Sequence, residues 1–308
     1  MQSSLLETVD CVCCGSHDYA IIHNPSQIDN LSREDLLKVY KSSSDEKLLN
    51  QLVECDGCGL AYLNPRVAED IILESYSGAE DLTFVSQNEE RIKTFKKSFL
   101  KFAQKYSVNI AKESKVLDIG CAGGAFPKAA HDLGFDVIGI EPSGYLCDWG
   151  KKTYGLDLRP GFLEKQNFEP KAFDVVTLWD VVEHLTDPKT ELRRIGNILK
   201  DKGYLLVNYP DYNSVVAKIM GLKWPFLLSV HLFYFSPKTI KALLNDCGFE
   251  VMEVKPHWQT LKLGYVLGRA ASYFSVFKIF QKVVKVIGLS NVPIAYYLGQ
   301  TQVVARKL

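Results

Sequence analysis

The segment VLDIGCAGGAF at residues 116–126 constrains the fold of this chain more than any other. Its first four residues are mostly apolar and predict a strand that is buried on both faces, while a helical pattern runs from its last residue to Leu133. Between the strand and the helix, Gly120, Gly123 and Gly124 let the backbone turn tightly and approach a ligand closely. The segment therefore predicts a strand, a turn that binds a small molecule, and a helix.

Two acidic residues near this turn indicate which small molecule binds there. Asp118 precedes the first glycine, and Glu141 lies at the end of the next predicted strand, within residues 135–143. A dinucleotide pyrophosphate is anionic and binds backbone N–H groups at a helix start, so an acid beside it is unfavourable. Asp118 instead suits an amino group, and an acid about 20 residues after such a turn accepts hydrogen bonds from ribose hydroxyls. The two acids favour S-adenosylmethionine, and an ordinary tight turn is the alternative.

The turn resembles the first motif of class I S-adenosylmethionine-dependent methyltransferases, in which an acid is followed by alternate glycines. Ala122 stands where the second glycine is usual, and alanine narrows the freedom of the turn without excluding the ligand. The resemblance implies a Rossmann-like α/β fold with a seven-stranded, mostly parallel sheet whose seventh strand is antiparallel. The cofactor contacts that it implies near the turn are Asp118, Gly120, Cys121, Gly124 and Glu141.

Three aromatic residues are further candidates for cofactor contacts. Phe162 lies in the loop after the expected short third strand, and there it could stack on the adenine ring. The fourth strand carries Trp179 to the carboxyl edge of the sheet, where ligands bind in open α/β folds. Tyr76 belongs to a segment, 70–106, with a helical pattern, and it is a candidate for the methionine end of the cofactor. An aromatic residue on a helix is more often part of the core, which is the alternative for Tyr76.

The candidate catalytic residues are Asp180 and His231. Asp180 follows the fourth strand and is expected to face the cofactor or the substrate. Glu183 and His184 could form a metal-binding or acid–base pair, but successive residues of a helix point in different directions, which argues against that pair. His231 is the better candidate for a general base, because a neutral imidazole can take a proton from a hydroxyl acceptor near pH 7. A histidine that packs or caps the lid is the alternative.

Two long insertions are expected to form the acceptor pocket. The resemblance places the remaining strands at 203–210, 248–258 and 296–307. The fifth and sixth strands end at the same edge of the sheet, so the insertions that follow them, 211–231 and 259–293, both emerge over the active site. The sequence HLFYFS, which begins at His231, resembles the corresponding stretch of ubiquinone-pathway O-methyltransferases and of many sugar methyltransferases.

Four of the eight cysteines form two pairs with the spacing of metal ligands. Each pair encloses two residues and is followed by glycine; the pairs are Cys11 with Cys14 and Cys55 with Cys58. The N-terminus has no basic start and no apolar core of a signal peptide, so we expect a cytoplasmic chain with reduced thiols. Two such pairs predict a structural, tetrahedral Zn²⁺ site, with a helix at 32–40 between them. Cys13, His17 and His23 are alternative ligands, and four reduced cysteines without a metal are the other alternative.

The second cysteine pair continues into GLAYLNPR, and the segment 55–66 resembles the zinc-binding head of methyltransferases that modify sugars in glycan and natural-product pathways. The resemblance divides the chain into a zinc module at 1–69, a helical cap or linker at 70–112 and a methyltransferase domain at 113–308. It implies O-methylation of a sugar hydroxyl on a nucleotide-linked or lipid-linked glycan. The alternatives are an RNA methyltransferase and a non-catalytic scaffold, and the net acidic N-terminal body argues against nucleic acid.

The C-terminal part of the chain differs in charge from the rest. Residues 254–308 contain eight Lys or Arg and no Asp or Glu, whereas the preceding part carries 28 basic and 36 acidic residues. An expected helix at 268–287 is otherwise mainly apolar and aromatic, and it places six residues on one narrow stripe: Arg269, Ser272, Ser275, Lys278, Lys282 and Lys285. Such a helix is typical of peripheral contact with a membrane, here its inner face. A homodimer interface and a helix buried in its own lid are the alternatives.

Overall fold

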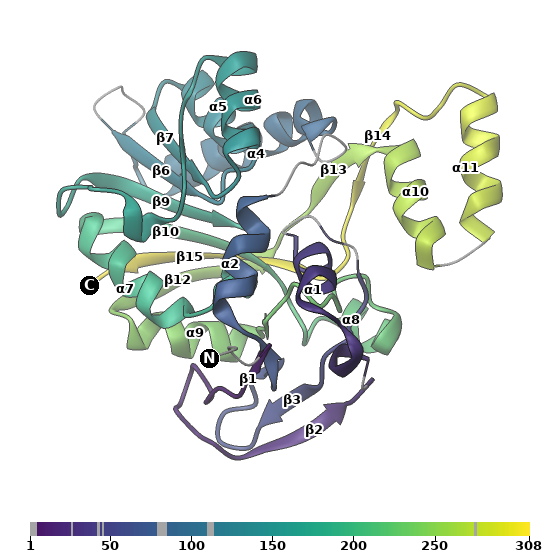
Figure 1. Ribbon diagram of the computed structural model, residues 1–308. Coiled ribbons are helices and arrows are strands. Elements are labelled where there is room, and N and C mark those ends of the chain that lie inside the picture. Colours follow the sequence, from purple (N-terminus) through teal and green to yellow (C-terminus); the bar gives the residue numbers. More distant parts are fainter. Residues whose placement is uncertain are drawn as a thin grey trace.

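A twisted seven-stranded sheet forms the centre of the molecule (Figure 1). The computed structural model describes residues 5–25, 27–41, 44, 46–78, 85–109, 114–273 and 276–308. In the order in which they lie side by side, the strands are β12 (Phe249–Pro256), β15 (Gln300–Lys307), β10 (Leu199–Pro210), β9 (Phe173–Trp179), β6 (Lys115–Ile119), β7 (Asp136–Glu141) and β8 (Asp157–Pro160). β15 runs antiparallel to both of its neighbours, and the other pairs are parallel. This confirms the predicted Rossmann-like fold with an antiparallel seventh strand.

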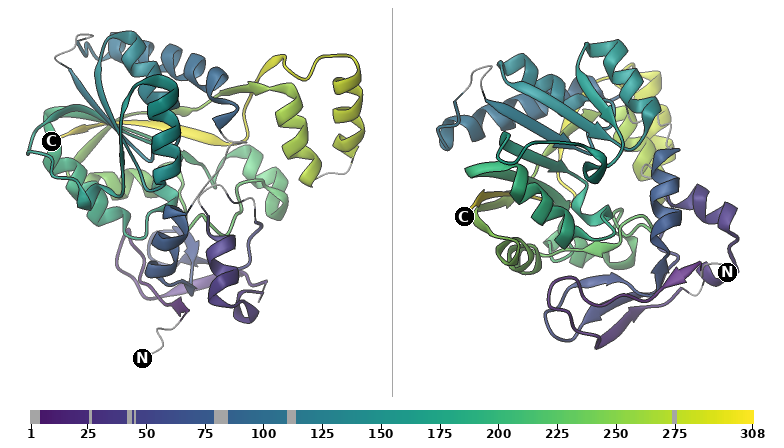
Figure 2. Two further views of the ribbon diagram at one scale, coloured as in Figure 1. Left: turned by 45° about the horizontal axis from the view of Figure 1, so that its top comes forward. Right: turned by 60° about the vertical axis from the view of Figure 1, so that its left-hand side comes forward.

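Helices cover both faces of the sheet because alternate strand residues point to opposite sides (Figure 2). The helices of the sheet domain are α4 (Asn88–Lys105), α5 (Ala125–Leu133), α6 (Gly144–Tyr154), α7 (Pro188–Ile198) and α9 (Pro237–Asp246). On one face, Val116 packs with the phenylalanines of α4 and α5. On the other face, its neighbour Leu117 belongs to the core that contains Leu192 of α7 and Ile240 of α9. The predicted burial of β6 on both faces is confirmed.

The N-terminal part forms a second sheet, to which the later chain contributes a strand. Its strands are β2 (Tyr19–His23), β3 (Leu52–Cys55), β4 (Ala61–Leu63) and β11 (Phe233–Tyr234), with β1 (Leu6–Glu7) and β5 (Arg66–Val67) paired beside it. β11 lies in the chain after β10 and pairs with β4. The Ser229 hydroxyl donates to the Lys47 carbonyl at 3.0 Å and accepts from the Leu49 amide at 2.9 Å. The N-terminal part is therefore joined to the sheet domain by backbone pairing and by a shared apolar core.

The predicted helix between the two cysteine pairs is present. It is α1 (Arg33–Val39), and Ser32 caps it. The Ser32 side chain accepts from the Asp35 amide and the Asp35 carboxylate accepts from the Ser32 amide, which together form a capping box. Within the described residues, the helical pattern at 70–106 is not one continuous helix, because α2 (Glu69–Ser77) ends before Gly78 and α4 begins at Asn88. Residues 79–84 of that pattern lie outside the described residues.

The expected helix at 268–287 is wrong as a single element. The chain forms two helices there, α10 (Leu263–Tyr273) and α11 (Val276–Val286), which pack against each other; residues 274 and 275 lie outside the described residues. An added Cβ on Gly268 would lie 2.9 Å from the Gln281 side chain, so the two helices approach closely at this point. Pairing partly covers the face of α11 that contains Phe277, Gln281 and Val284. The predicted polar stripe is thereby divided between the two helices.

Smaller elements complete the insertions. They are α8 (Val215–Met220), β13 (Gln259–Lys262), β14 (Pro293–Tyr296) and the 3-10 turns η1 (Ile28–Asn30), η2 (Leu163–Lys165), η3 (Val182–His184) and η4 (Gly221–Lys223). β13 pairs with β14 beside the α10–α11 hairpin, on its side toward the central sheet. None of the helices in the described ranges is both long enough and apolar enough to cross a lipid bilayer.

Candidate active site

A cavity of about 640 Å³ opens at the carboxyl ends of the central strands. Both insertions contribute to its wall, through residues such as Phe226 and Tyr265. Nine of the residues predicted to bind cofactor or act in catalysis line it: Tyr76, Asp118, Gly120, Cys121, Glu141, Phe162, Trp179, Asp180 and His231. Gly124, also predicted to contact the cofactor, is not among the lining residues; it caps α5 with a φ of 81°. Its role as a cofactor contact stays a prediction.

The glycine-rich turn brings the backbone to the edge of this cavity. Gly120 has a φ of 71°, and a Cβ at this position would lie 2.5 Å from a methyl carbon of Val181. Only glycine fits that conformation and that space without displacement of Val181. Ala122, the departure from the family motif, adopts a φ of 46°, a conformation that costs alanine more than glycine. Its amide donates to the Glu141 carboxylate at 2.9 Å, which holds this part of the turn in place.

Glu141 is a fixed, buried carboxylate in the cavity wall. Its second oxygen accepts from the Ser143 amide at 3.0 Å, so both oxygens are oriented by backbone donors. Each oxygen can accept a second hydrogen bond. Burial raises the pKa of Glu141 to about 7, against the two backbone donors, which lower it. Its position at the end of β7 fits the pair of ribose hydroxyls of S-adenosylmethionine.

Asp118 and Trp179 offer further groups to a cofactor. Asp118 is 2% exposed, and one of its oxygens accepts from the Thr177 hydroxyl at 2.5 Å. Burial raises the pKa of Asp118 well above its ordinary value, and a cationic amino group beside it would favour the charged form. The Trp179 indole Nε1 is a buried donor that has no acceptor in the described part of the chain. A buried orphan donor beside a cavity is one that a ligand can satisfy.

Asp180 is held by three side-chain amides. One carboxylate oxygen accepts from Asn208 at 2.5 Å and from Gln300 at 2.9 Å, and the other accepts from Gln259 at 3.5 Å. Burial raises the pKa of Asp180 to about 6, while Gln300 lowers it. The φ of Asp180 is 55°, in the left-handed region. The catalytic role predicted for Asp180 stays a prediction, and these three amides were not found from the sequence.

A cluster of Glu183, His184 and His231 lies elsewhere in the same cavity wall. Ligand atoms of the three side chains lie within 4.8 Å of one another, and the two imidazole centroids are 4.7 Å apart. The His231 Nδ1 donates to the Phe226 carbonyl at 2.8 Å, and the His184 Nδ1 donates to the Val230 carbonyl at 2.9 Å. Because a carbonyl can only accept, each Nδ1 carries the proton, and each Nε2 is unprotonated and able to accept in the neutral ring.

The electrostatics of this cluster keep it uncharged. Burial, and then the nearby His184, hold the pKa of His231 well below its ordinary value. Burial also lowers the pKa of His184 to about 4. Both oxygens of Glu183 are buried and have no hydrogen-bond partner in the described ranges, and burial, with the neighbouring Asp180, raises the pKa of Glu183 well above its ordinary value. Near pH 7 the two imidazoles are neutral, which is the form a proton acceptor needs.

The expectation that Glu183 and His184 point in different directions is wrong. The two residues lie on the 3-10 turn η3 and not on a regular α-helix, and both line the main cavity beside His231. The sequence singled out Glu183 and His184 as a possible pair, but it did not predict that His231 lies close to both. His231 reaches η3 from an insertion, and the Leu232 amide donates to the Glu183 carbonyl at 2.8 Å. This backbone hydrogen bond holds the segment that carries His231 against η3.

Tyr76 lies beside the same cluster. Its hydroxyl is 3.3 Å from the His184 Nδ1, its ring packs edge-on against His184, and the residue is buried at 8% exposure. Phe162 is half-buried in the wall before η2, with the Lys165 ammonium 6.0 Å from its ring centroid. A role for either ring in binding the cofactor stays a prediction.

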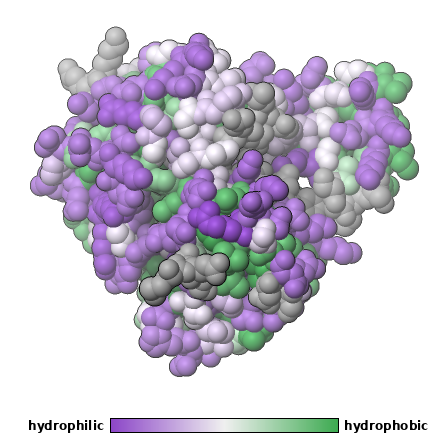
Figure 3. Space-filling model, viewed as in Figure 1, coloured by the Kyte–Doolittle hydropathy of each residue, from purple (hydrophilic) through white to green (hydrophobic). Residues whose placement is uncertain are grey.

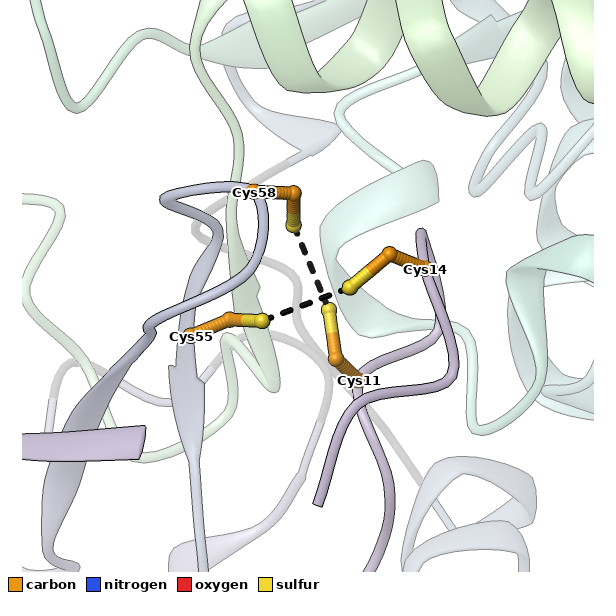
Figure 4. Close-up of side chains that lie close together, drawn as sticks. All are labelled: Cys11, Cys14, Cys55 and Cys58. Carbon is orange, nitrogen blue, oxygen red and sulfur yellow. Dashed lines mark hydrogen bonds between the residues drawn. The ribbon is translucent and has the colours of Figure 1, made fainter. Parts of the chain in front are cut away.

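The four predicted cysteine ligands converge in the N-terminal part (Figure 4). The Cys11 and Cys58 sulfurs are 3.5 Å apart, and the Cys14 and Cys55 sulfurs are 3.4 Å apart. A tetrahedral Zn²⁺ with Zn–S bonds of about 2.3 Å places sulfurs about 3.8 Å apart, so the donor set and its spacing fit zinc. Cys13 is not part of this cluster; its thiol donates to the Thr239 carbonyl at 3.7 Å.

The alternative histidine ligands are not in the cluster. His17 pairs with the Asp10 carboxylate at 2.5 Å, and the four converging groups are all cysteines. Gly15 and Gly59, which follow the two pairs, have φ values of 74° and 79°. Their amides donate to the carbonyls of Cys11 and Cys55 at 2.7 and 2.9 Å, and these bonds close both knuckles. Four thiolates leave no open coordination position, so this site suits a structural metal.

Comparison with known proteins adds to this picture. A family model described as a methyltransferase domain matches residues 86–254. The ubiquinone biosynthesis O-methyltransferase of Azorhizobium caulinodans is 27% identical over 164 residues, which cover 48% of this chain and 63% of that protein. The protein of the same name from Coxiella burnetii is 24% identical over 174 residues, which cover 52% of this chain and 74% of that one.

A solved structure shares the fold of the sheet domain. A chain from a Haloferax volcanii complex that contains the Trm112 methyltransferase activator is 16% identical, with a TM-score of 0.51. The match covers 72% of this chain and 93% of that chain.

Proposed function

The chain belongs to the class I S-adenosylmethionine-dependent methyltransferases, and on that premise we propose that it transfers a methyl group to a hydroxyl oxygen. The observation that carries this proposal is His231, which lines the same cavity as Asp118 and Glu141 and whose Nδ1–H···O=C bond to Phe226 leaves Nε2 unprotonated in the neutral ring. The names of the relatives, which are O-methyltransferases, support the same acceptor atom.

Residues of this chain would hold the donor in a defined orientation. Glu141 would accept from the ribose hydroxyls and Asp118 from the amino group, while Phe162 would stack on the adenine. Trp179 offers its indole N–H to a ligand acceptor. When bound, S-adenosylmethionine supplies an electrophilic methyl group on a positively charged sulfur. The main task of the protein is then to position the acceptor oxygen in line with that methyl group and to exclude water.

His231 would remove the proton that the acceptor hydroxyl loses. The proton moves to Nε2, and the hydrogen bond from Nδ1–H to the Phe226 carbonyl keeps the ring in place and persists in the imidazolium. Glu183 lies within 4.8 Å and, when ionised, would stabilise that imidazolium. Asp180, Gln259 and Gln300 also line the wall and would orient the acceptor.

We further propose that the acceptor is a sugar hydroxyl of a nucleotide-linked or lipid-linked glycan. The support is the resemblance of residues 55–66 to the head of sugar-modifying methyltransferases, together with the cysteine cluster. Cys11, Cys14, Cys55 and Cys58 would hold one structural Zn²⁺.

Calorimetry of the purified protein tests the first step of this proposal. We expect S-adenosylmethionine and its demethylated product, S-adenosylhomocysteine, each to bind with one site per chain. Absence of binding by both would contradict the function. Binding without methyl transfer to any sugar nucleotide or lipid-linked sugar would instead support the non-catalytic scaffold.

The pKa of Glu141 predicts how this binding depends on pH. The ionised carboxylate is the better acceptor for hydroxyl donors, so the affinity for S-adenosylhomocysteine should be lost as the pH falls through about 7. We expect the dissociation constant to be about tenfold larger at pH 6 than at pH 8, because about a tenth of such a group is ionised one unit below its pKa.

Two variants separate Glu141 from the other titrating groups. Glu141→Gln cannot ionise, so its binding should be weaker at pH 8 and should show no pH step near 7. Asp136→Asn, at the exposed opposite end of β7, should keep both the affinity and the step. A pH step of the same size in the Glu141→Gln protein would assign the titration to another group.

A further inference from the structure

The connection between β12 and β15 builds a two-helix hairpin that projects from the sheet domain (Figures 1 and 2). α10 faces the main cavity and contributes Tyr265, Val266 and Arg269 to its wall. α11 packs on the outer side of α10, and among its described residues none is buried. The hairpin is therefore both a wall of the cavity and an exposed outer surface.

The outer surface of α11 is strongly apolar. Six of its apolar residues, up to the position just after the helix end, are at least half exposed: Val276, Ile279, Phe280, Val283, Val286 and Ile287. Spacings of three and four residues place them on one continuous face. The partly buried residues Phe277, Gln281 and Val284 form a different face, and Gln281 touches α10 at Gly268. Figure 3 shows hydrophobic residues along the outer edge of the molecule at α11.

Lysines border this apolar face. Lys278, Lys282 and Lys285 are exposed on α11, and the last two also line a groove of about 460 Å³ at the base of the hairpin together with Lys262. No acidic residue is among those that line the groove. From residue 254 to the last residue the chain has eight basic and no acidic residues, so no carboxylate of this segment offsets the lysines.

The apolar face of α11 and the lysines beside it together favour some binding partners over others. In a symmetric dimer that pairs α11 antiparallel with its copy, the lysines of one helix would lie beside those of the other, which is unfavourable. A partner with an apolar interior and a negatively charged surface complements both the apolar face and the lysines. A bilayer with anionic headgroups has this chemistry, and an amphipathic helix lies in it with its apolar face in the acyl boundary and its lysines at the phosphates.

We propose that the α10–α11 hairpin docks the protein on an anionic lipid surface, through the apolar face of α11 and its three lysines. Docking would hold the cavity beside the bilayer, because α10 is part of the cavity wall. Given the methyl transfer proposed above, the acceptor would then be the lipid-linked form of the glycan. The docking itself does not depend on that activity.

Vesicle flotation of the full chain tests the docking. We expect the protein to float with vesicles of phosphatidylcholine and phosphatidylglycerol, and to bind vesicles of phosphatidylcholine alone at least tenfold more weakly. The variant Lys278→Gln, Lys282→Gln, Lys285→Gln should lose about tenfold or more of its partitioning into anionic vesicles. A control with the same change in charge, at exposed lysines of α4 and α6, should partition as the unchanged protein does: Lys97→Gln, Lys101→Gln, Lys152→Gln.

A second variant tests the apolar part, and two further measurements identify other outcomes. Ile279→Ser, Phe280→Ser, Val283→Ser should not float with either vesicle. Equal flotation of the α11 and control lysine variants would overturn the proposal. A dimer in light scattering that the serine variant dissolves, without vesicle binding by the unchanged protein, would assign the face to a second copy and also overturn it. Calorimetry with S-adenosylhomocysteine should give the same affinity for all of these proteins, which separates failed docking from failed folding or a failed cofactor site.

Discussion

Replacement of His231 by Asn should abolish most methyl transfer while the protein still binds S-adenosylhomocysteine. The asparagine amide can donate to the Phe226 carbonyl, as the His231 Nδ1 does at 2.8 Å, but it has no group equivalent to the basic Nε2. A general base typically contributes a factor of about 10² to 10⁴ to the rate, so we expect kcat to fall by about that factor with little change in the affinity for the cofactor product. Single-turnover transfer from a labelled donor and calorimetry measure the two quantities.

The neighbours of His231 provide the comparison for this variant. His184→Asn removes an imidazole of the same cluster whose Nδ1 also donates to a backbone carbonyl, and we expect a smaller loss of rate. The pH dependence gives a second readout. The rate of the unchanged protein should fall as the pH drops through the range in which His231 takes up a proton, below its ordinary value, and His231→Asn should not show that fall. Unchanged turnover by His231→Asn would leave His231 with a packing role only.

Local order along the chain is enough to place Asp118 and Glu141 in the cavity. Asp118 and Glu141 lie at the ends of adjacent parallel strands, β6 and β7, so the strand pattern alone brings them to one edge. The amides that hold Asp180 are different. Gln259 and Gln300 are 79 and 120 residues away from it, on an insertion strand and on the last strand, and no local pattern marks them.

The hairpin shows a second limit of sequence patterns. A spacing of three and four residues continues through 268–287, and one long amphipathic helix and two paired helices both satisfy it. The distinction depends on the close approach of Gly268 and Gln281, which is tertiary. Because the segment forms two helices, Arg269 lines the main cavity and does not continue the exposed lysine row of α11.

The cysteine cluster and His231 are connected through one sheet. Cys55 ends β3, which pairs with β4, and β4 pairs with β11 so that Phe233 is opposite Tyr62. The Leu63 amide donates to the Leu232 carbonyl at 3.0 Å, next to His231 in the chain. A metal that fixes the cysteine knuckles would thereby also fix the segment that carries His231, the proposed base. Loss of the metal should therefore disturb the position of His231 in the cavity.

Cys11→Ser should therefore remove the metal, lower the melting temperature and reduce the rate together. We expect one zinc per chain in the unchanged protein by elemental analysis and less than a tenth of that in the variant, because hydroxyl oxygen is a poor substitute for thiolate. Loss of a site that contributes on the order of 3 to 5 kcal/mol to folding should lower Tm by about 5 to 8 °C in a chain of this size. Cys13→Ser is the matched control, since its thiol contacts the Thr239 carbonyl and not the cluster. It should keep the metal, the Tm and the rate; zinc that survives in Cys11→Ser, or that is lost equally in Cys13→Ser, would contradict the assigned ligand set.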